Sequence, residues 1–528
     1  MSAVVTDQFR ISNANNFVDS VLNEASSYYV FLGLPNPTSA GFGRTDNANA
    51  TTWPLNPVDN FSYQSHYRDT MMFGKKINSA NIRRVVKKQS WVQNNRYDMY
   101  RHDYDANNLT PNSQTTTLYR SNFYVMNDDF KVYICIDNGS SGSNLKGNRS
   151  QIQPDFTDVE PITLSDGFTW KYLFTISPSD IIKFDSIEYI VLPNDWSTTT
   201  DSQIKSVRES GDSDINKNQI KKVYVADPGK TGGYQSTVGA PNPHIVNILG
   251  DGTGAKVSVS VLGNGTIDDV KVVSGGSGYT YGIVDLKGIQ ESPNSNALGK
   301  LIPIIPPSKG HGFDIYKELG ADKVLIYARF DDSTKNFPID SAFAQVGILK
   351  NPQKTNSENI FTANSFSSLD SFKVSSALDD DRDYPGMKIT QTVTGGTARG
   401  YVASYDTDTQ IVKYFQDRSL YFPNGQDHAD LSKNNTDLPE SVLKFSGSEN
   451  ITFLDDVNGN QTPSIDSSLI GITTTVNNKI VNLGVSYTNG IAESEINKKT
   501  GDVIYITNRS VVQRDLRQKE DIKIVLEF

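Results

Sequence analysis

Alternating aromatic residues in one short segment place the strongest constraint on the fold. In "SDGFTWKYLFTI", residues 165–176, bulky side chains stand at every second position: Phe168, Trp170, Tyr172, Phe174 and Ile176. Successive side chains of a strand point to opposite faces, so these five share one face. The pattern predicts a half-buried strand with an aromatic core face. It does not favour a stacking surface for sugars or bases, because the only basic residue nearby, Lys171, falls on the other face.

Length and composition extend this prediction to the whole chain. The 528 residues exceed the size at which a single core keeps growing, so we expect about two to four domains. Tyr (25), Phe (24) and Gly (39) are abundant, and helical patterns are few, which favours strands joined by many turns. We therefore predict a mainly β fold (α+β with few helices), in which a discontinuous β-rich core domain carries an inserted β domain and additional β-hairpin insertions.

Charge and cysteine content exclude several classes of protein. The formal net charge is -10, whereas general nucleic-acid binding requires a concentrated basic surface, so we expect no nucleic-acid partner. The single cysteine, Cys135, excludes an intrachain disulfide framework and a multi-cysteine zinc site. No signal-type apolar run opens the sequence, and no stretch approaches the roughly 20 apolar residues of a membrane span. We expect that the protein does not associate with a membrane and that it is assembled in the cytoplasm.

Further elements follow from periodicity. Phe17, Val18, Val21 and Leu22 recur at helical spacing after an Asn-rich cap region, while residues 36–70 read as a long loop. The segment 77–91 favours a strand at a sheet edge. Other predicted strands or hairpins lie at 28–34, 123–136, 187–192, 343–352 and 520–528. Two Gly/Thr-rich blocks, 250–280 and 393–415, share a strand–turn–strand plan and are interpreted as two copies of a small β-module.

A search for catalytic and metal-binding patterns yields none. Cys135 lies between two isoleucines and reads as a buried structural thiol. The histidines show no tight ligand spacing, so surface or loop positions are expected for them: His66, His102, His244, His311 and His428. Acidic runs from Asp379 and Asp455 lack the Gly and Glu of a calcium loop and are expected to be solvated turns. We predict no enzyme activity, no cofactor and no metal.

One basic cluster suggests a protein interface. "IRRVVKK", residues 82–88, holds four basic residues in seven and precedes Trp91. Contact with nucleic acid is one interpretation, but an acidic protein partner fits the overall charge better. We predict that Arg83, Arg84 and Trp91 contribute to a partner interface.

Several motifs together resemble a known family. "DGFTWKYLFTIS" followed by "EYIVLP" is similar to a segment of a baseplate wedge subunit of contractile-tailed phages, the gene-product-eight family of T-even-like myophages. Four further segments resemble that family in the same order: "IRRVVKKQSW", "FYVMNDDFKVYICIDNG", "FAQVGILKNP" and "GDVIYITNRSVVQRDLRQKEDIKIVLEF". The resemblance covers roughly residues 1–228, 310–352 and 500–528.

The resemblance implies a function and a division of the chain. It implies a non-enzymatic, late structural protein of the virion tail baseplate, a homodimer that contacts neighbouring wedge proteins numbered six, seven and ten. It also implies a wedge core domain interrupted by insertions. The core is then 1–91, 216–228, 310–352 and 500–528, the inserted β-rich domain is 92–215, and the Gly/Thr-rich and second β insertions are 229–309 and 353–499.

Two expectations and one alternative complete the interpretation. Ile522, Ile524, Leu526 and Phe528 alternate with Lys523, Val525 and Glu527, so the last strand should pair in a sheet. The family resemblance implies that this strand belongs to the same domain as the strand at 28–34. Residues 232–300 should be removable, leaving a soluble dimer. The alternative function is a tail-associated protein that binds or cleaves glycans, since Tyr-rich β-modules can stack sugars and paired carboxylates can cleave them.

Overall fold

The computed structural model forms two compact units. It describes these residues: 6–23, 25–34, 67–216, 219–236, 243–292, 297–331, 342–416, 443–447, 449–513 and 518–528. Unit 1 comprises residues 1–18, 83–325 and 525–528, and unit 2 comprises 19–82 and 326–524. The chain therefore passes from one unit to the other four times. His66, His428 and most of the loop predicted at 36–70 lie outside the described residues.

Antiparallel strands dominate both units, which confirms the prediction of a mainly β fold with few helices. The helices in the described residues include α1 (Asp7–Leu22), α3 (Pro178–Phe184), α4 (Ser202–Asn216) and α5 (Ile315–Glu318). Short 3-10 helices are η2 (Leu118–Arg120) and η3 (Lys287–Ile289). Within the described ranges, none of the helices combines the length and apolar character that a membrane crossing requires.

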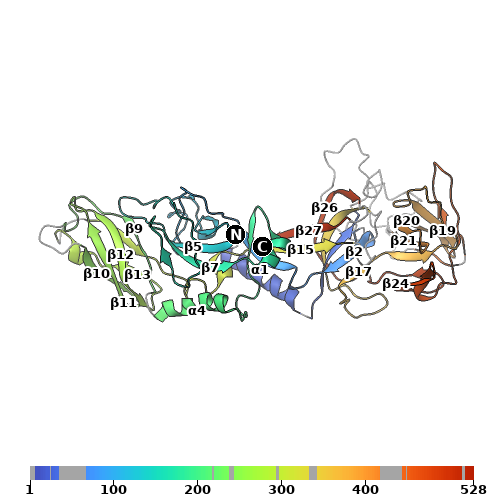
Figure 1. Ribbon diagram of the computed structural model, residues 1–528, viewed down its shortest axis with the longest axis horizontal. Helices are drawn as coiled ribbons and strands as arrows, with labels where there is room; N and C mark the ends of the chain where they lie inside the picture. The colour runs from blue at the N-terminus through green and yellow to red at the C-terminus, as the bar shows by residue number, and fades with distance from the viewer. Residues whose placement is uncertain are drawn as a thin grey trace. The chain divides into compact units, whose positions relative to one another are not determined.

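The aromatic segment forms the centre of a four-stranded sheet in unit 1. The order is β4-β5-β7-β6, with β4 at Tyr124–Met126, β5 at Lys131–Asp137, β6 at Ile162–Thr163 and β7 at Thr169–Thr175 (Figure 1). The predicted hairpin 123–136 is confirmed, because β4 and β5 pair antiparallel with Val125 opposite Tyr133. The aromatic face packs as predicted: Phe168 and Trp170 stack at 5.4 Å between ring centroids, and Tyr97 meets Trp170 edge-on.

The prediction that this strand is only half-buried is wrong. Lys171 and Leu173, on the face opposite the aromatic rings, are also buried. The Lys171 ammonium donates to the Val159 carbonyl at 2.9 Å and to the Ser210 hydroxyl, on α4, at 3.0 Å. A lysine can therefore occupy a covered face because its charged end finds oxygen acceptors there, which period-2 alternation does not reveal.

The first Gly/Thr-rich block belongs to a second sheet of unit 1. The order is β12-β11-β10-β13, with β10 at His244–Gly250, β11 at Thr253–Val261, β12 at Ile267–Ser277 and β13 at Gly282–Val284. A two-stranded sheet joins β9 (Val223–Asp227) to β14 (Lys300–Pro303). One core cluster includes side chains from both sheets, among them Val223, Val257 and Leu301.

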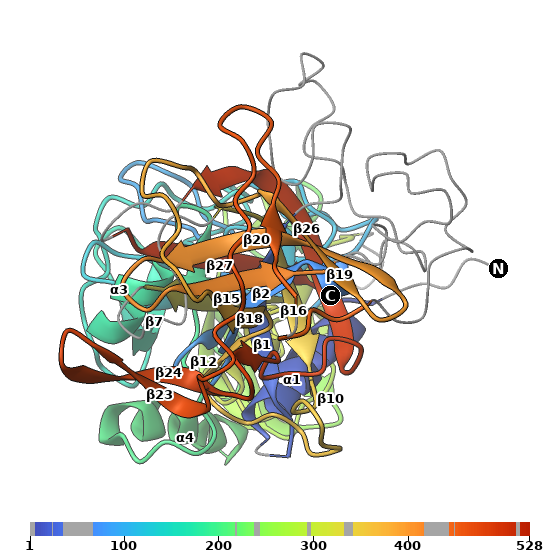
Figure 2. The ribbon, with the colours of Figure 1, turned by 90° about the vertical axis from the view of Figure 1, so that its right-hand side faces the viewer.

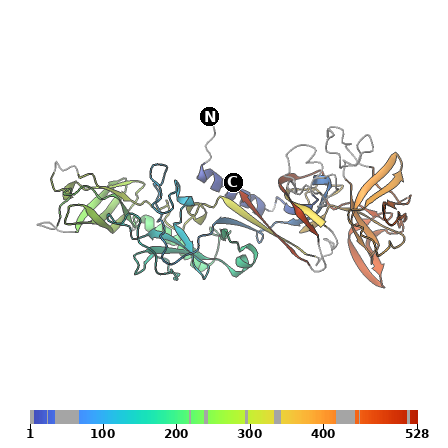
Figure 3. The ribbon, with the colours of Figure 1, turned by 90° about the horizontal axis from the view of Figure 1, so that it is seen from above.

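The C-terminal strand pairs in a sheet, as predicted. The order is β27-β15-β3-β8, with β3 at Ile82–Lys87, β8 at Tyr189–Val191, β15 at Lys323–Phe330 and β27 at Glu520–Glu527. β15 and β27 run side by side, in yellow and red (Figure 3). One expectation is corrected: β3 is an internal strand of this sheet, not an edge strand. The strand at 28–34 lies in another sheet, and its membership of one domain with β27 stays a prediction.

Unit 2 contains three further sheets. The first sheet has five strands in the order β17-β2-β1-β16-β26. Its strands are β17 (Ser365–Ser367), β2 (Met71–Lys76), β1 (Tyr28–Gly33), β16 (Ala342–Lys350) and β26 (Asp502–Gln513). The second sheet has six strands in the order β22-β19-β20-β21-β18-β25. Its strands are β22 (Thr452–Phe453), β19 (Lys388–Val393), β20 (Gly396–Asp406), β21 (Ile411–Phe415), β18 (Asp370–Lys373) and β25 (Ile491–Ala492). The third is the pair β23 (Gly471–Val476) and β24 (Lys479–Tyr487), a two-stranded ribbon (Figure 2). The second Gly/Thr-rich block thus lies in a six-stranded sheet, whereas the first lies in a four-stranded one.

Helix α1 begins earlier than predicted. Its buried residues Ile11, Ala14, Val18 and Val21 recur at helical spacing, so the Asn-rich stretch is part of the helix and not a cap before it. Asn15 shows why a poor helix former is tolerated here: its side-chain oxygen accepts a hydrogen bond from Arg84 Nε at 2.5 Å.

The predicted division of the chain into seven parts remains a prediction, but three consecutive parts lie in the same compact unit. Residues 92–215, 216–228 and 229–309 all belong to unit 1, and β9 of the middle part pairs with β14 of the last. The second insertion, 353–499, lies in unit 2.

Candidate functional site

The predicted interface residues make contacts within unit 1. Arg84 is 4% exposed, and its guanidinium carbon lies 4.3 Å from the centre of the Tyr316 ring. Arg83 Nη2 lies 2.8 Å from Asp180 Oδ1, and its guanidinium covers the Phe184 ring on α3. β3 thus uses both arginines to hold neighbouring helices. The structure holds no partner, so the predicted interface itself stays a prediction.

Trp91 is separate from this pair. Its indole Nε1 donates to the Ser150 hydroxyl at 3.0 Å, and its backbone nitrogen donates to the Met126 carbonyl at 2.9 Å. The side chain is half-buried. Trp91 therefore connects the end of β4 to the loop that contains Ser150.

The two lysines of the same basic run reach a cleft. Lys87 and Lys88 line a hollow of about 620 Å³ in unit 1, together with residues from α1, η2 and the end of β27. Five cationic and four acidic side chains line it. Lys323 lies 3.1 Å from Asp322 and 2.9 Å from Glu527, and its hydrogen bond is the main cause that lowers the pKa of Glu527. Because charges of both signs are present and partly paired, the cleft has no strong preference for anions.

Unit 2 contains a second and larger cleft, of about 810 Å³. Its walls are the loop 354–363, part of β24 at 484–486 and the segment 488–495. The Glu493 carboxylate lies on this wall with 48% of its side chain exposed, accepts a hydrogen bond from Asn356 Nδ2 at 2.8 Å and lies 3.6 Å from Lys444 Nζ. Glu495 is more enclosed: it accepts from the Ser367 backbone nitrogen at 2.6 Å, and burial raises its pKa.

The two acidic runs that resemble incomplete calcium loops meet at an arginine. Arg382 Nη2 lies 2.8 Å from Asp379, and Nη1 lies 3.1 Å from Asp455. The guanidinium also donates to the Gly459 carbonyl at 2.5 Å. Arg382 thus occupies the position between the turns that a cation would take. Over the described part of the chain, no cluster of three or more His, Cys, Asp or Glu side chains is arranged to hold a metal.

The cysteine and two of the histidines are buried. Burial is confirmed for Cys135, and it raises the pKa of the thiol well above its ordinary value. The expected surface or loop position is wrong for His244, which lies in β10 and is 5% exposed. His311 lies in a loop, as expected, but it is only 3% exposed. His311 Nδ1 lies 2.6 Å from Glu318 Oε1. The other carboxylate oxygen of Glu318, Oε2, accepts a hydrogen bond from the Gly312 backbone nitrogen. No spacing rule in the sequence signals this pair.

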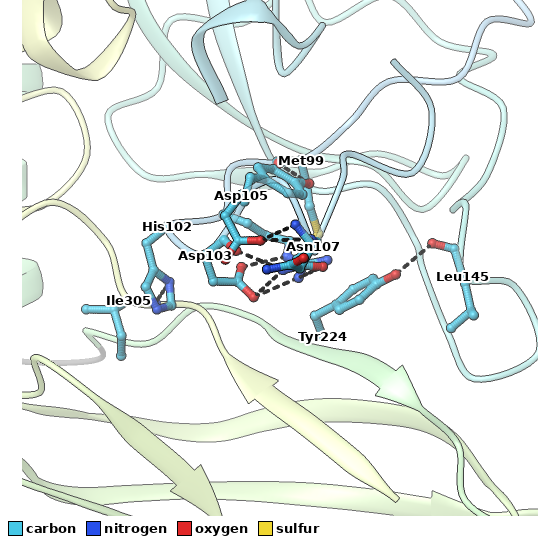
Figure 4. A network of polar contacts seen from close by, with 11 residues as sticks. Met99, His102, Asp103, Asp105, Asn107, Leu145, Tyr224 and Ile305 are labelled. Atoms are coloured by element: carbon cyan, nitrogen blue, oxygen red, sulfur yellow. Dashed lines mark hydrogen bonds and ion pairs between the residues drawn. The ribbon is translucent and has the colours of Figure 1, made fainter. Parts of the chain in front are cut away.

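A further polar network of unit 1 includes Asp103 and Tyr224 (Figure 4), and Arg101 contacts both of them. The guanidinium donates to Asp103 at 2.9 and 2.8 Å and is enclosed between the rings of Tyr104 and Tyr224, 4.8 and 4.0 Å away. Burial opposes ionisation of Asp103, but the hydrogen bonds from Arg101 outweigh it and lower the pKa of Asp103. His102 does not pair with Asp103; its Nδ1 accepts from the Ile305 backbone nitrogen at 3.2 Å.

These arrangements hold loops and strands in place more than they present reactive groups. Most charged side chains described above are paired with a neighbour of the same unit. No protein-family model matches the chain, and no curated protein matches it either.

Proposed function

We propose that this chain is a structural subunit of the baseplate wedge of a contractile-tailed bacteriophage. It acts in the virion tail as a homodimer that binds neighbouring wedge proteins during assembly. The observation that carries the proposal is the set of five family-like motifs in one order. Each of them supplies a strand: β3, the hairpin β4–β5, β7 with β8, β16, and β26 with β27.

The contacts of the described residues support a binding role over a catalytic one. The buried thiol of Cys135 has a raised pKa, so it is a poor nucleophile at neutral pH. The His311 imidazole is closed off against Glu318 and Tyr100. Large permanent interfaces instead use apolar and polar surface spread over many strands, which both units have in abundance.

Mass measurement of the purified chain tests this proposal. Light scattering is expected to give twice the chain mass of 58.3 kDa for the protein alone. A larger complex should form when the wedge proteins six, seven and ten encoded in the same genome are added. A chain that binds none of them contradicts the proposal. So does turnover of a capsular glycan or peptidoglycan that is lost on substitution of one carboxylate, which would favour the glycan-cleaving alternative.

A further inference from the structure

One face of the β10–β13 sheet (Figure 1) carries a concentrated set of exposed apolar side chains. Ile245, Leu249, Tyr281 and Ile283 are between 54% and 65% exposed. Leu249 and Ile283 stand directly opposite each other on β10 and β13, so their side chains lie on the same face. Ile245 lies on that face too, because it is four residues before Leu249 on one strand, and Tyr281 comes two residues before Ile283. We call these four residues the outer patch.

The other face of this sheet forms the core of its part of unit 1. Val246, Ile248 and Val284, which alternate with the outer patch along β10 and β13, are buried in the cluster that also contains Val223 and Leu301. None of the four outer-patch residues belongs to that cluster or packs against it as a partly buried neighbour. Folding of the sheet therefore does not need apolar side chains there. Exposed apolar patches of this kind mark interaction sites.

The backbone that carries Tyr281 is held in place from two sides. Asp251 Oδ1 accepts hydrogen bonds from the backbone nitrogens of Thr280 at 2.9 Å and Tyr281 at 3.3 Å. Asp251 Oδ2 accepts from the Thr280 hydroxyl at 2.5 Å. Tyr279 is buried, and its hydroxyl donates to the Ile248 carbonyl at 3.1 Å. An exposed tyrosine on a fixed backbone loses little conformational entropy when a partner covers it, and tyrosine is enriched among interface hot spots.

Charge at the outer patch favours an uncharged partner. The patch contains no acidic or basic residue. Asp251, which is close to it in the fold, already accepts three hydrogen bonds from the segment that holds Tyr281. Lys256 on β11 stands opposite Asn247, at the margin of the patch. A surface that covers the patch should therefore be apolar in its centre, as a second copy of the same patch is.

The size of the outer patch fits a dimer interface. Its four side chains together expose roughly 400 Å². A standard protein interface buries about 800 Å² on each partner, of which roughly 450–500 Å² is apolar. The outer patch thus supplies most of the apolar surface that one side of such an interface needs.

We propose that the outer patch is the centre of the homodimer interface, where it is covered by the outer patch of a second copy of the chain. The two β10–β13 sheets pack face to face around a two-fold axis, with the apolar side chains in the middle and Lys256 of each copy at the rim. This inference deepens the proposed function, because it rests on the proposed homodimer and assigns a surface to it.

Substitutions in the full-length chain test this surface. Ile283→Asp is expected to raise the dimer Kd by about 100-fold or more, because the two-fold axis brings two carboxylates into the apolar centre. Ile480→Asp is the matched control: Ile480, in β24, is 79% exposed, and its replacement should change the Kd by less than about threefold. Tyr281→Ser, which adds no charge, should raise the Kd by about tenfold or more.

Sedimentation equilibrium gives each Kd, and thermal melting shows that each variant folds. Tyr281→Ser removes only an exposed ring, so it decides the question if Ile283→Asp lowers the melting temperature. A folded variant of Tyr281 or Ile283 that dimerises as tightly as the original chain overturns the inference.

Hydroxyl-radical footprinting of the unaltered chain tests the surface directly. Oxidation of Tyr281 should be roughly threefold slower or more above the dimer Kd than below it, because its ring becomes buried, whereas Ile480 should react equally at both concentrations. Equal oxidation of Tyr281 at both concentrations overturns the inference. So does protection of Tyr281 that appears only when a wedge protein is added, because the patch then binds that protein and not a second copy.

The two proposals fail in different ways. A chain that dimerises and binds wedge proteins, but in which Tyr281 stays reactive, overturns the assignment of the outer patch and leaves the proposed function intact. A chain that is monomeric at all concentrations overturns this assignment together with the homodimer.

Discussion

Arg101 is a buried cation whose loss should destabilise unit 1. The side chain is 1% exposed, and removal of its charge leaves Asp103, 22% exposed, without its cation. Breaking a buried pair from one side costs about 3 kcal/mol or more. We expect Arg101→Met to lower the free energy of unfolding by about that amount, measured by urea denaturation. Lys271→Met, which changes an 81% exposed cation, should change it by less than about 0.5 kcal/mol. Equal effects in the two variants would contradict this assignment.

The same pair predicts a pH dependence. In the folded protein the pKa of Asp103 is lowered, so its stabilising contribution is present above the unfolded pKa and is lost as the pH falls through the folded pKa. In Arg101→Met the carboxylate keeps its burial without the cation, so its pKa should rise and its penalty should disappear on protonation. The stability difference between the two proteins should therefore narrow from about pH 7 to about pH 4. Urea midpoints at both pH values measure this, and a constant difference would contradict it.

At the residue scale, the sequence predicts whether a side chain is buried only for residue types that are nearly always found in one environment. Cys135 between two isoleucines is such a case, and its burial was predictable. Arg84 and Lys171 are not, because their buried charges depend on acceptors from distant segments: Asn15 for Arg84, and Val159 with Ser210 for Lys171. The basic run at 82–88 therefore looks like surface in the sequence although half of it is internal.

At the element scale, alternation predicts strands and their pairing better than their place in a sheet. β27 is the clearest example: Ile524 is buried, Ile522, Leu526 and Phe528 are half-buried, and the intervening side chains are exposed. Alternation does not identify its neighbour β15, because register and sheet order depend on partners far away in sequence. The same limit explains why β3 was expected at an edge.

Phe528 offers a test of the terminal strand. Its ring lies 5.5 Å from that of Phe17, and its backbone nitrogen donates to the Asp322 carbonyl at 3.2 Å. Phe528→Asp places a carboxylate against the Phe17 ring and beside Glu527, so we expect a loss of about 2 kcal/mol and faster hydrogen exchange in the part of α1 around Phe17. Val525→Asp, on the exposed face of the same strand, is the matched control. If the control accelerates exchange as strongly, the alternation of β27 does not determine its packing.

At the scale of the whole molecule, the chain returns to each unit after long excursions. Unit 1 takes residues from the start, the middle and the end of the chain, and unit 2 takes two separate segments. The family-like motifs predict a core domain interrupted by insertions, and this division stays a prediction. Insertions are recognised in sequence by turn-rich boundaries, whereas units are defined by shared cores. Residues 216–228 show the difference: they read as core domain, but their side chains pack in the cluster of the adjoining insertion.

This shared core reverses the expectation that residues 232–300 are removable. Five buried apolar side chains outside that segment belong to its cluster: Ile220, Val223, Val225, Leu301 and Ile305. Exposing them forfeits roughly 10 kcal/mol of gross burial, comparable to the whole net stability of a domain. We now expect the deletion of 232–300 to aggregate, judged by size-exclusion chromatography. Deletion of the tip of the β23–β24 hairpin, 473–482, removes no residue of the large core clusters and should leave a soluble chain with an unchanged melting temperature. A soluble 232–300 deletion that melts cooperatively would contradict this expectation. It would mean that these five side chains pack in a core without the β10–β13 sheet, and that position 229 is a true domain boundary.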